Sequence, residues 1–351
     1  MKALEPLIEQ LQSGESLSEE GAELAARLLA EEVVDDELKR AFLIALGEKG
    51  ETVQEVSAFA RVFRSLALNP GLEDWAARGI DIVGTGGSGS GGYNISSVTA
   101  FVVAAAGVPV LKHGNRAITS QSGSADFLGM AGISLESDPA RLRKSLETLN
   151  FCFFFAPAFH PAFKHIMPVR KAMAAEGKRS VFNILGPLIN PAAPRAQLLG
   201  VSSLEWLEPL AASLTQLGLA RGLTVYSELS DGRRMDELTT AGENHLAGMG
   251  DLADVRQTKT PEDWGFVRTN PEQLRGAEAE ANWQLFQDIL EGRGRSGLVD
   301  TIVLNAAAAL WVAEKADSLE TGLSMARELL LGGAVRDWVS RTRAFYQEAS
   351  I

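Results

Sequence analysis

Residues 80–126 read IDIVGTGGSGSGGYNISSVTAFVVAAAGVPVLKHGNRAITSQSGSAD, and six of the nine residues from Gly84 to Gly92 are glycine. Glycine has no Cβ, so the backbone N–H groups of such a loop can turn inward around an anion. The apolar run Ile80 to Val83 before the loop predicts a buried strand. Three residues can cap the alanine-rich helix that follows: Asn94, Ser96 and Ser97. A loop that leads its amides into a helix N-terminus is typical of phosphate binding.

Two other interpretations of the glycine loop compete with a phosphate site. A flexible Gly/Ser linker is normally flanked by polar sequence, whereas this loop lies between two strongly apolar elements. Gly84, Gly86 and Gly89 match the dinucleotide fingerprint GxGxxG. An NAD site, however, needs a carboxylate after the second strand, where this chain has basic residues. A phosphate site is therefore favoured, and an NAD-dependent oxidoreductase is the alternative from another class.

A second polar stretch, Lys112 to Arg116, reads KHGNR. We expect it at the carboxyl end of the second strand, where open α/β sheets bind ligands. Its cations suit a polyanion, although a solvated basic loop has the same composition. Three hydroxyl residues follow it: Ser120, Ser122 and Ser124. Together the two loops predict a site for a multiply phosphorylated small molecule.

The composition of the 351-residue chain is that of a globular enzyme, with 46% hydrophobic and 22% charged residues. The net charge of −12 disfavours nonspecific binding to nucleic acid or to anionic membranes. The single cysteine, Cys152, lies in the apolar run FCFFF and is expected to pack in the core. The first thirty residues carry acids throughout, unlike a signal peptide, so we expect a cytoplasmic protein without membrane contact.

Hydrophobic periodicity predicts an α/β fold with a mainly parallel central sheet flanked by helices, after a smaller all-helical N-terminal domain. The small domain is expected at residues 1–71, joined by helix 161–178. The large domain would comprise residues 72–160 and 179–351. Strands are predicted at 80–83, 108–111, 151–155, 180–184 and 223–226. Helices are predicted at 97–106, 124–131, 139–149, 161–174, 204–216, 277–290, 298–313, 319–331 and 335–348.

Two further groups of residues carry chemistry. Arg170 lies ten residues after His160, close to three helical turns, so both are expected on one helix face. Its guanidinium suits bidentate capture of a carboxylate, but a surface salt bridge with Glu176 would be equally compatible with the sequence. Asp236 and Glu237 are adjacent acids after a strand and a turn. With a hydroxyl they would suit Mg²⁺ bound to a diphosphate, although such acid pairs are often only solvated.

Five motifs occur in the order and spacing of one family: GTGGSGSGGYNISS, KHGNRAITSQSGSAD, HPAFKHIMPVRK, FNILGPLINP and MDEL. Over nearly its whole length the chain resembles the anthranilate phosphoribosyltransferases. This resemblance implies a fold similar to that of the pyrimidine nucleoside phosphorylases. It also implies transfer of phosphoribosyl from phosphoribosyl pyrophosphate to the amine of anthranilate, with release of diphosphate, in tryptophan biosynthesis. Finally, it implies a homodimer formed through the N-terminal helices.

The resemblance also implies the site residues, none of which is a covalent nucleophile. Phosphoribosyl pyrophosphate would be bound by Gly84, Gly87, Ser88, Gly92, Asn94, Ile95, Ser96, Ser97, Lys112, His113, Gly114, Asn115, Arg116, Ser120 and Ser124. Anthranilate would be bound by Gly84, Asn115, His160 and Arg170. The Mg²⁺ cofactor would be bound by Ser96, Asp236 and Glu237.

The chain departs from the family pattern at three places. Ser88 stands where the family usually has Asp, Gly92 stands where it has Thr, and Arg233 and Arg234 interrupt the usual acidic motif. The added arginines are expected to make the diphosphate side less negative. Phosphoribosyl transfer is thus better supported than the exact acceptor. A paralogue with another acceptor, or one that binds nucleotide or nucleic acid, is the alternative on the same scaffold.

Overall fold

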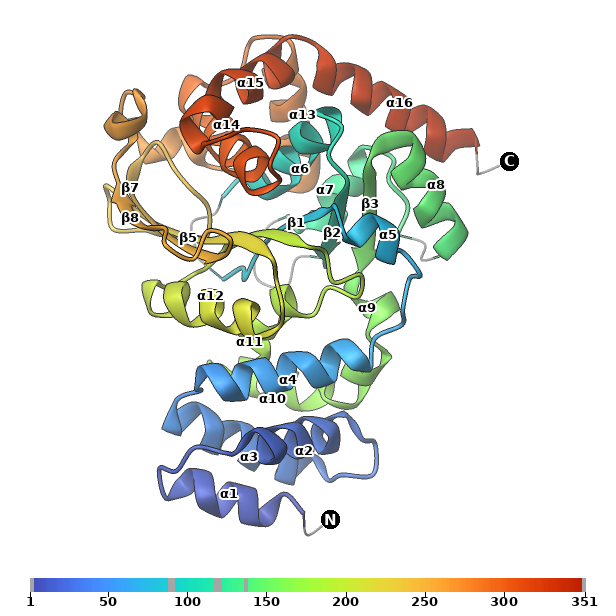
Figure 1. Cartoon of the computed structure of the whole chain (residues 1–351), viewed down its shortest axis with the longest axis vertical. Helices are drawn as coiled ribbons and strands as arrows, with labels where there is room; N and C mark the ends of the chain where they lie inside the picture. Colours follow the sequence, from blue (N-terminus) through green and yellow to red (C-terminus); the bar gives the residue numbers. More distant parts are fainter. Residues whose placement is uncertain (1–2, 88–91, 117–121, 136–137, 349–351) are drawn as a thin grey trace.

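The computed structural model describes residues 3–87, 92–116, 122–135 and 138–348. Its first part is helical, and the helices stack at the N-terminal end of the molecule (Figure 1). They are α1 (Glu5–Gln12), α2 (Glu19–Ala30), α3 (Asp36–Lys49) and α4 (Val53–Ser65). Local sequence explains where they begin, since Ser18 and Asp35 cap α2 and α3, and Thr52 and Glu55 form a capping box on α4. The predicted helical start is confirmed.

An eight-stranded sheet forms the centre of the rest of the chain, with the path β3-β2-β1-β4-β5-β7-β8 and β6 paired to β5. The strands are β1 (Ile80–Gly84), β2 (Val110–Gly114), β3 (Phe151–Phe155), β4 (Ala196–Gly200), β5 (Arg221–Leu229), β6 (Arg234–Met235), β7 (Gly242–Gly250) and β8 (Arg256–Lys259). The path from β3 to β5 is parallel, and β6, β7 and β8 are antiparallel additions. The predicted fold class, a mostly parallel sheet flanked by helices, is confirmed.

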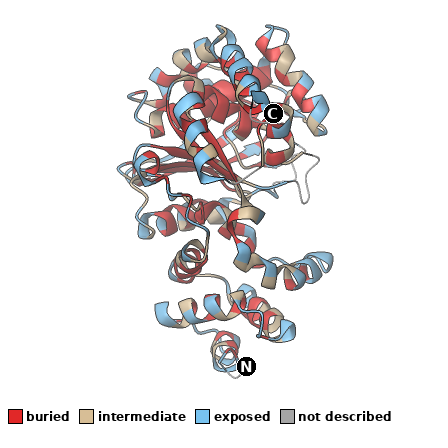
Figure 2. Ribbon diagram, turned by 90° about the vertical axis from the view of Figure 1, so that its right-hand side faces the viewer, coloured by how far each residue is buried: buried red, intermediate tan, exposed pale blue. Residues whose placement is uncertain are grey.

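Helices cover both faces of the sheet (Figure 1). One face carries α6 (Ile95–Ala105), α13 (Ala279–Leu290), α14 (Ser296–Val312), α15 (Leu319–Leu331) and α16 (Ala334–Glu348). Helix α14 is apolar on nearly every side and is enclosed by α6 and α15, so it forms the centre of this layer. Figure 2 shows the buried strands between the helical layers. Among the described helices, none combines the length and apolar character that crossing a bilayer requires.

The other face of the sheet shares a hydrophobic core with the N-terminal helices. This core includes α10 (Met167–Ala175), α11 (Phe182–Leu185) and α12 (Leu207–Gln216). Helix α10 packs on α3, and α12 packs on α4. The segment 161–178 therefore lies with the N-terminal helices, while the exact division into residues 1–71, 72–160 and 179–351 stays a prediction.

The remaining elements connect these layers. They are α5 (Glu73–Ala76), α7 (Ser124–Met130), α8 (Pro139–Leu149), α9 (Ala156–Phe159), and the short 3₁₀ helices η1 (Pro161–His165), η2 (Gly186–Leu188), η3 (Leu204–Trp206), η4 (Pro261–Trp264) and η5 (Pro271–Leu274). Most predicted helices agree with the structure to within a few residues, and the predicted strand 151–155 agrees with β3.

Three expectations about local structure are wrong. The predicted strand 180–184 is the start of helix α11, where the Asn183 side chain accepts a hydrogen bond from the Ser180 N–H. A short apolar run does not distinguish a strand from a buried helix. The predicted helix 161–174 is divided at Ile166 into η1 and α10, because Pro168 lacks the N–H that a continuous helix would use. Strands β4, β6, β7 and β8 have no counterpart among the predicted strands.

Candidate active site

The glycine loop and the acidic pair meet directly. The backbone N–H of Gly86 donates a hydrogen bond to Asp236 Oδ2 at 3.0 Å. A Cβ at Gly84 would overlap the same carboxylate, so only glycine allows this approach. Gly86 and Gly87 have φ values of +67° and +78°, a conformation that L residues rarely adopt. Glycine in this loop is therefore required both by its backbone conformation and by the contact with Asp236.

The acidic pair lies across the carboxyl ends of two parallel strands. Gly200 ends β4, and a Cβ there would overlap the backbone carbonyl of Asp236. The N–H of Thr85, just after β1, donates to the Gly200 carbonyl at 2.9 Å. Strand β6, which immediately precedes Asp236, is held by antiparallel pairing to β5. The close packing of backbone on glycine thus places an acid beside the loop after β1.

Ser96 and Glu237 complete this acidic centre. Burial and the neighbouring Asp236 raise the pKa of the Glu237 carboxyl well above its usual range, while the Ser96 backbone N–H and Lys112 act in the opposite direction. A divalent cation would relieve the repulsion between the two acids, and carboxylate and hydroxyl oxygens are ligands that Mg²⁺ takes. The described residues contain no cluster of three His, Cys, Asp or Glu side chains, so remaining Mg²⁺ ligands would come from substrate and water. The adjacent acids suit a divalent ion, and the assignment of Ser96, Asp236 and Glu237 as its ligands stays a prediction.

Lys112 is not in a loop, and that expectation is wrong. It lies within β2, fully buried, and its Nζ donates to the Ile82 carbonyl. Burial lowers its pKa to about 8, and the nearby acids Asp81 and Glu237 oppose this effect. The pKa of Asp81 is in turn raised by burial to about 6. Lys112 therefore interacts with the buried Asp81 and the partly buried Glu237, where it balances the charge behind the acidic centre.

The second loop begins after β2 and lies against α7. Gly114, the last residue of β2, has no room for a large side chain, since a Cβ would come within 3.2 Å of Ser124 Cβ. The carbonyl of Asn115 accepts from the Ala125 N–H at 3.2 Å. Both Asn115 and Arg116 are exposed, as expected for ligand-binding residues. Ser88 and Ser120 fall outside the described residues.

The far end of the glycine loop carries the other predicted phosphate-binding residues. Asn94 precedes α6 but makes no capping hydrogen bond, so its predicted capping role is wrong. The helix begins at Ile95, whose side chain is buried, so only its backbone could reach a ligand. Ser97 is also buried, and its hydroxyl has no hydrogen-bond partner among the described residues. Gly92 forms a backbone bridge with Arg275.

Two buried histidines contact each other, and one of them, His160, is a predicted acceptor-binding residue. His113 Nδ1 lies 3.2 Å from the Gly186 carbonyl, which can only accept, so we place the proton on Nδ1. His113 Nε2 then accepts from His160 Nε2 at 3.2 Å. Burial lowers the pKa of His113 to about 3 and that of His160 to about 4. His160 is therefore neutral near pH 7, and its buried Nδ1 lone pair has no partner in the described part of the chain.

The Arg170 guanidinium lies near two aromatic rings that contact each other. Its central carbon is 5.7 Å from the Phe163 ring centre and 5.4 Å from that of Phe182. The guanidinium donates to the Phe182 carbonyl at 3.4 Å and to a methionine sulfur at 3.8 Å. His160 contacts the same Phe163 ring at 5.7 Å. Arg170 and His160 are therefore brought together by Phe163 and not, as predicted, by the periodicity of one helix.

The alternative of a salt bridge between Arg170 and Glu176 is wrong. Glu176 pairs with Arg40 at 2.6 Å and with Lys178 at 3.2 Å. Within residues 3–87, 92–116, 122–135 and 138–348, no acid pairs with Arg170, and burial lowers its pKa. An unpaired guanidinium in an aromatic environment is suited to the carboxylate of an aromatic acid.

Comparisons with known proteins agree with this site. A profile described as "Glycosyl transferase family, a/b domain" matches residues 76–336, and one described as "Glycosyl transferase family, helical bundle domain" matches residues 5–67. The anthranilate phosphoribosyltransferase of Brucella suis biovar 1 is 42% identical over 335 residues, which is 95% of each chain. The chain belongs to the anthranilate phosphoribosyltransferase family. The Rhodospirillum rubrum family member is also 42% identical, over 95% of this chain and 93% of its own.

Solved structures of the family have the same fold. The anthranilate phosphoribosyltransferase of Thermus thermophilus is 40% identical, with a TM-score of 0.85 over 99% of this chain and 100% of its own. The Saccharomyces cerevisiae enzyme, solved in complex with PRPP and Mg, is 22% identical with a TM-score of 0.83, covering 99% of each chain. The predicted family is therefore confirmed. Membership of this family argues against the alternative of an NAD-dependent oxidoreductase.

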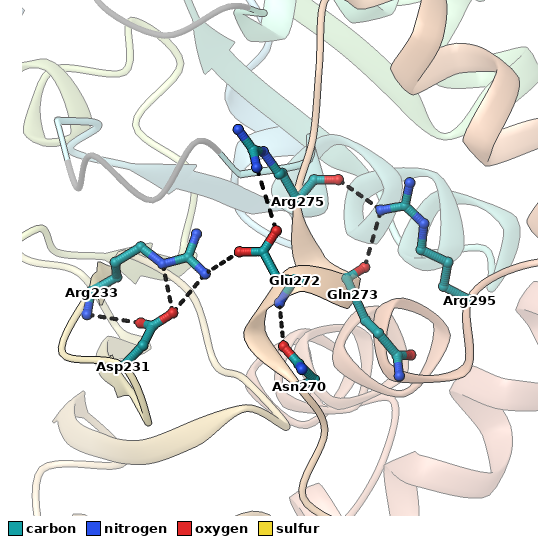
Figure 3. Close-up of polar contacts among 7 residues, drawn as sticks. All are labelled: Asp231, Arg233, Asn270, Glu272, Gln273, Arg275 and Arg295. Atoms are coloured by element: carbon teal, nitrogen blue, oxygen red, sulfur yellow. Dashed lines mark hydrogen bonds and ion pairs between the residues drawn. The ribbon is translucent and has the colours of Figure 1, made fainter.

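Arg233, one of the two arginines that interrupt the family's usual acidic motif, lies among acids in the structure. Figure 3 shows Arg233 paired with Asp231 on its own hairpin and with Glu272 on η5, at 2.7 and 3.1 Å. Glu272 also pairs with Arg275 at 3.4 Å. Arg233 therefore offsets part of the negative charge of Asp231 and Glu272, and the expectation of a less negative diphosphate side stays a prediction.

One residue close to the site was missed by sequence reasoning. Asn282 is buried on α13 and donates to Asn94 Oδ1 at 2.9 Å. A lone asparagine within an amphipathic helix gives no local signal of such a contact, because the partner lies 188 residues away in the chain.

Proposed function

We propose that this protein transfers phosphoribosyl from phosphoribosyl pyrophosphate to the amine of anthranilate, releasing diphosphate, in tryptophan biosynthesis. One observation carries the choice of acceptor: the guanidinium of Arg170 is half-buried near the rings of Phe163 and Phe182 and pairs with no acid in the part of the chain that the structure describes. The family's enzymes are named for this reaction, and a yeast member was solved with 4-fluoroanthranilate. Asn115 would contribute to the same acceptor site, with Gly84 at the junction of the two substrates.

The donor would lie between the two loops. The inward amides of the glycine loop, with Asn94, Asn115 and Arg116, would bind its phosphates. Ser96, Asp236 and Glu237 would hold Mg²⁺, which neutralises charge on the leaving diphosphate when bound. Lys112, being buried, would offset the charge of Glu237 and would not act as an exposed phosphate ligand.

The reaction needs the enzyme chiefly to position two reactants. The bond between the anomeric carbon and the diphosphate oxygen breaks through an oxocarbenium-like transition state, and the amine nitrogen forms the new bond. The neutral Nδ1 of His160, which has no partner among the described residues, would accept a hydrogen bond from the amine. The nitrogen loses its proton after the C–N bond forms. No side chain forms a covalent intermediate.

An assay of the purified chain tests this proposal. With Mg²⁺ present, phosphoribosyl pyrophosphate should be consumed only when anthranilate is added, with diphosphate and phosphoribosyl anthranilate produced in equal amounts. Turnover with another aromatic acid in place of anthranilate would instead support a paralogue with a different acceptor. Absence of turnover with any acceptor would contradict the proposal.

We also propose a homodimer formed through the N-terminal helices, in the cytoplasm. Leu24 on α2 and Val33 after it are apolar and exposed, at 44% and 79%. Replacing Leu24 with Glu should convert a dimer to a monomer in analytical ultracentrifugation. A monomeric wild-type chain would refute this part of the proposal.

The lone, buried Cys152 is compatible with a reducing compartment.

A further inference from the structure

A chain of buried side-chain amides connects three segments near the donor site. Asn282 Oδ1 accepts from the backbone N–H of Ala277 at 2.7 Å, and Asn282 Nδ2 donates to Asn94 Oδ1 at 2.9 Å. Ser122 Oγ donates to the same oxygen at 2.9 Å. Asn282 is fully buried. One residue of α13 thus contacts the segment after η5 and the end of the glycine loop, and through Asn94 it reaches the second loop.

The backbone N–H of Ala277 determines the direction of every hydrogen bond in this series of amides. A backbone N–H can only donate, so the amide oxygen of Asn282 must face Ala277 and its NH₂ group must face Asn94. Asn94 must then present its oxygen to Asn282. Two donors use both lone pairs of that oxygen. The orientation of the Asn94 amide is therefore set from position 282.

The segment that carries Ala277 is itself anchored. Arg295 donates to the carbonyls of Arg275 and Gln273 at 3.0 and 3.5 Å, as Figure 3 shows. Arg275 forms the backbone bridge to Gly92, and a Cβ at Gly276 would overlap the Gly92 carbonyl. The donor that orients Asn282 is therefore part of a fixed backbone.

Asn94 retains a donor for a ligand. Its NH₂ group makes one long bond, 3.4 Å to the Ser122 carbonyl, and its second N–H has no acceptor among the described residues. The residue is half-buried, between the glycine loop and the second loop. With this orientation the amide offers an N–H, and not an oxygen, to an anion.

We propose that Asn282 is a positioning residue for the donor substrate: it fixes the Asn94 amide with its N–H groups available to phosphate and holds the two phosphate-binding loops together. The inference rests on the proposed function for the identity of the donor. A positioning role and a purely structural role of Asn282 predict different effects of a carboxylate at this position. A carboxylate at position 282 would still accept from Ala277 but could not donate to Asn94. The Asn94 amide would then turn its NH₂ group toward the new carboxylate and its oxygen toward the substrate phosphate.

The test compares Asn282→Asp with Asn282→Ala. The alanine variant removes both hydrogen bonds and leaves a cavity, whereas the aspartate variant retains one bond and reverses Asn94. We expect Asn282→Asp to raise the KM for phosphoribosyl pyrophosphate about tenfold or more, and Asn282→Ala to raise it less. The KM for anthranilate should change by less than about twofold in both. The melting temperatures of the two variants need not follow the order of their KM values for phosphoribosyl pyrophosphate.

Leu290→Ala is the matched control, because Leu290 is buried at the other end of the same helix and touches none of these amides. It should lower the melting temperature through a cavity and leave the KM for phosphoribosyl pyrophosphate unchanged. If Asn282→Asp does not fold, Asn282→Ala and Ser122→Ala decide, each with an expected rise of about threefold.

Two results would overturn the inference: an Asn282→Asp variant whose KM for phosphoribosyl pyrophosphate stays within about twofold of wild type, or an equal rise in Leu290→Ala. Unchanged values in both fallback variants would do the same. If wild type does not turn over anthranilate, the proposed function fails by itself. Calorimetric binding of phosphoribosyl pyrophosphate with Mg²⁺ to the same variants then still tests the role of Asn282.

Discussion

The carboxylate of Asp236 accepts a hydrogen bond from the backbone N–H of Gly86 at 3.0 Å, although the two residues lie 150 positions apart in the chain. The contact joins the glycine loop to the acidic pair, so an anion bound by one and a cation held by the other would share a site. It depends on the absence of a side chain at Gly84 and Gly200.

Gly84→Ala should disrupt this contact. Its Cβ would overlap Asp236 Oδ2, so the acid or the loop must move, and the bond to a charged acceptor is worth about 1.5 to 3 kcal/mol. We expect kcat/KM to fall roughly ten- to a hundredfold.

Gly129→Ala is the control for that variant. A Cβ at Gly129, within α7, meets nothing within 4 Å, so the variant should be stabilised by about 0.5 to 1 kcal/mol with unchanged kinetics. Normal activity in Gly84→Ala would show that the loop adjusts at no cost.

Asp236→Asn combined with Glu237→Gln should abolish Mg²⁺-dependent turnover while the protein stays folded. The amides can still accept hydrogen bonds, including that of Gly86, but they lack the charge that holds a divalent cation. Circular dichroism and a titration of activity against Mg²⁺ would measure both effects. Asp231→Asn, in an exposed ion pair of the same hairpin, should cost less than about 1 kcal/mol of stability and leave activity intact. Wild-type turnover in the double variant would identify the acids as a solvated turn.

The sequence predicted those parts of the site whose residues lie within one short segment of the chain. The glycine loop, the acidic pair and Arg170 each have a local pattern that indicates their chemistry. The contact of Asp236 with Gly86 and that of Asn282 with Asn94 could not be predicted from such patterns, since they arise from strand order and helix packing. The position of Lys112 was predicted wrongly for a related reason: a lysine near a strand end is expected to be exposed until its acidic partners, Asp81 and Glu237, are known.

The prediction of secondary structure failed for short segments whose sequence shows no clear periodicity. Strand β4 reads AQLLG and is too brief to show a period, yet it lies between β1 and β5 in the sheet. Strands β7 and β8 contain polar residues and glycine, and they are stabilised by pairing more than by their own propensity.

The buried histidine pair predicts a loss of stability in acid. His113 and His160 have folded pKa values of about 3 and 4, below the unfolded value of about 6.5. Their contribution to the free energy of unfolding is complete above pH 6.5 and is lost as the pH falls toward 4, because the unfolded chain binds the protons first. The melting temperature should fall between pH 7 and pH 5, and less steeply in His160→Gln. The same slope in both proteins would refute this assignment.

Arg170→Lys tests the acceptor, because the phosphate loops would serve any phosphoribosyl donor. Lysine retains the charge but loses the planar fork, which would bind both carboxylate oxygens and which lies near the rings of Phe163 and Phe182. A charged hydrogen bond is worth about 1.5 to 3 kcal/mol, so the KM for anthranilate should rise roughly ten- to a hundredfold.

The KM for phosphoribosyl pyrophosphate should stay nearly constant in Arg170→Lys, and aniline, which has no carboxylate, should be a poor acceptor for both proteins. Arg40→Lys is the matched control, since Arg40 pairs with Glu176 on the surface and should leave both constants unchanged. If Arg170→Lys instead leaves the KM for anthranilate unchanged, the guanidinium does not bind the acceptor carboxylate. Combined with poor use of anthranilate by wild type, that result would mean that the natural acceptor is a different molecule.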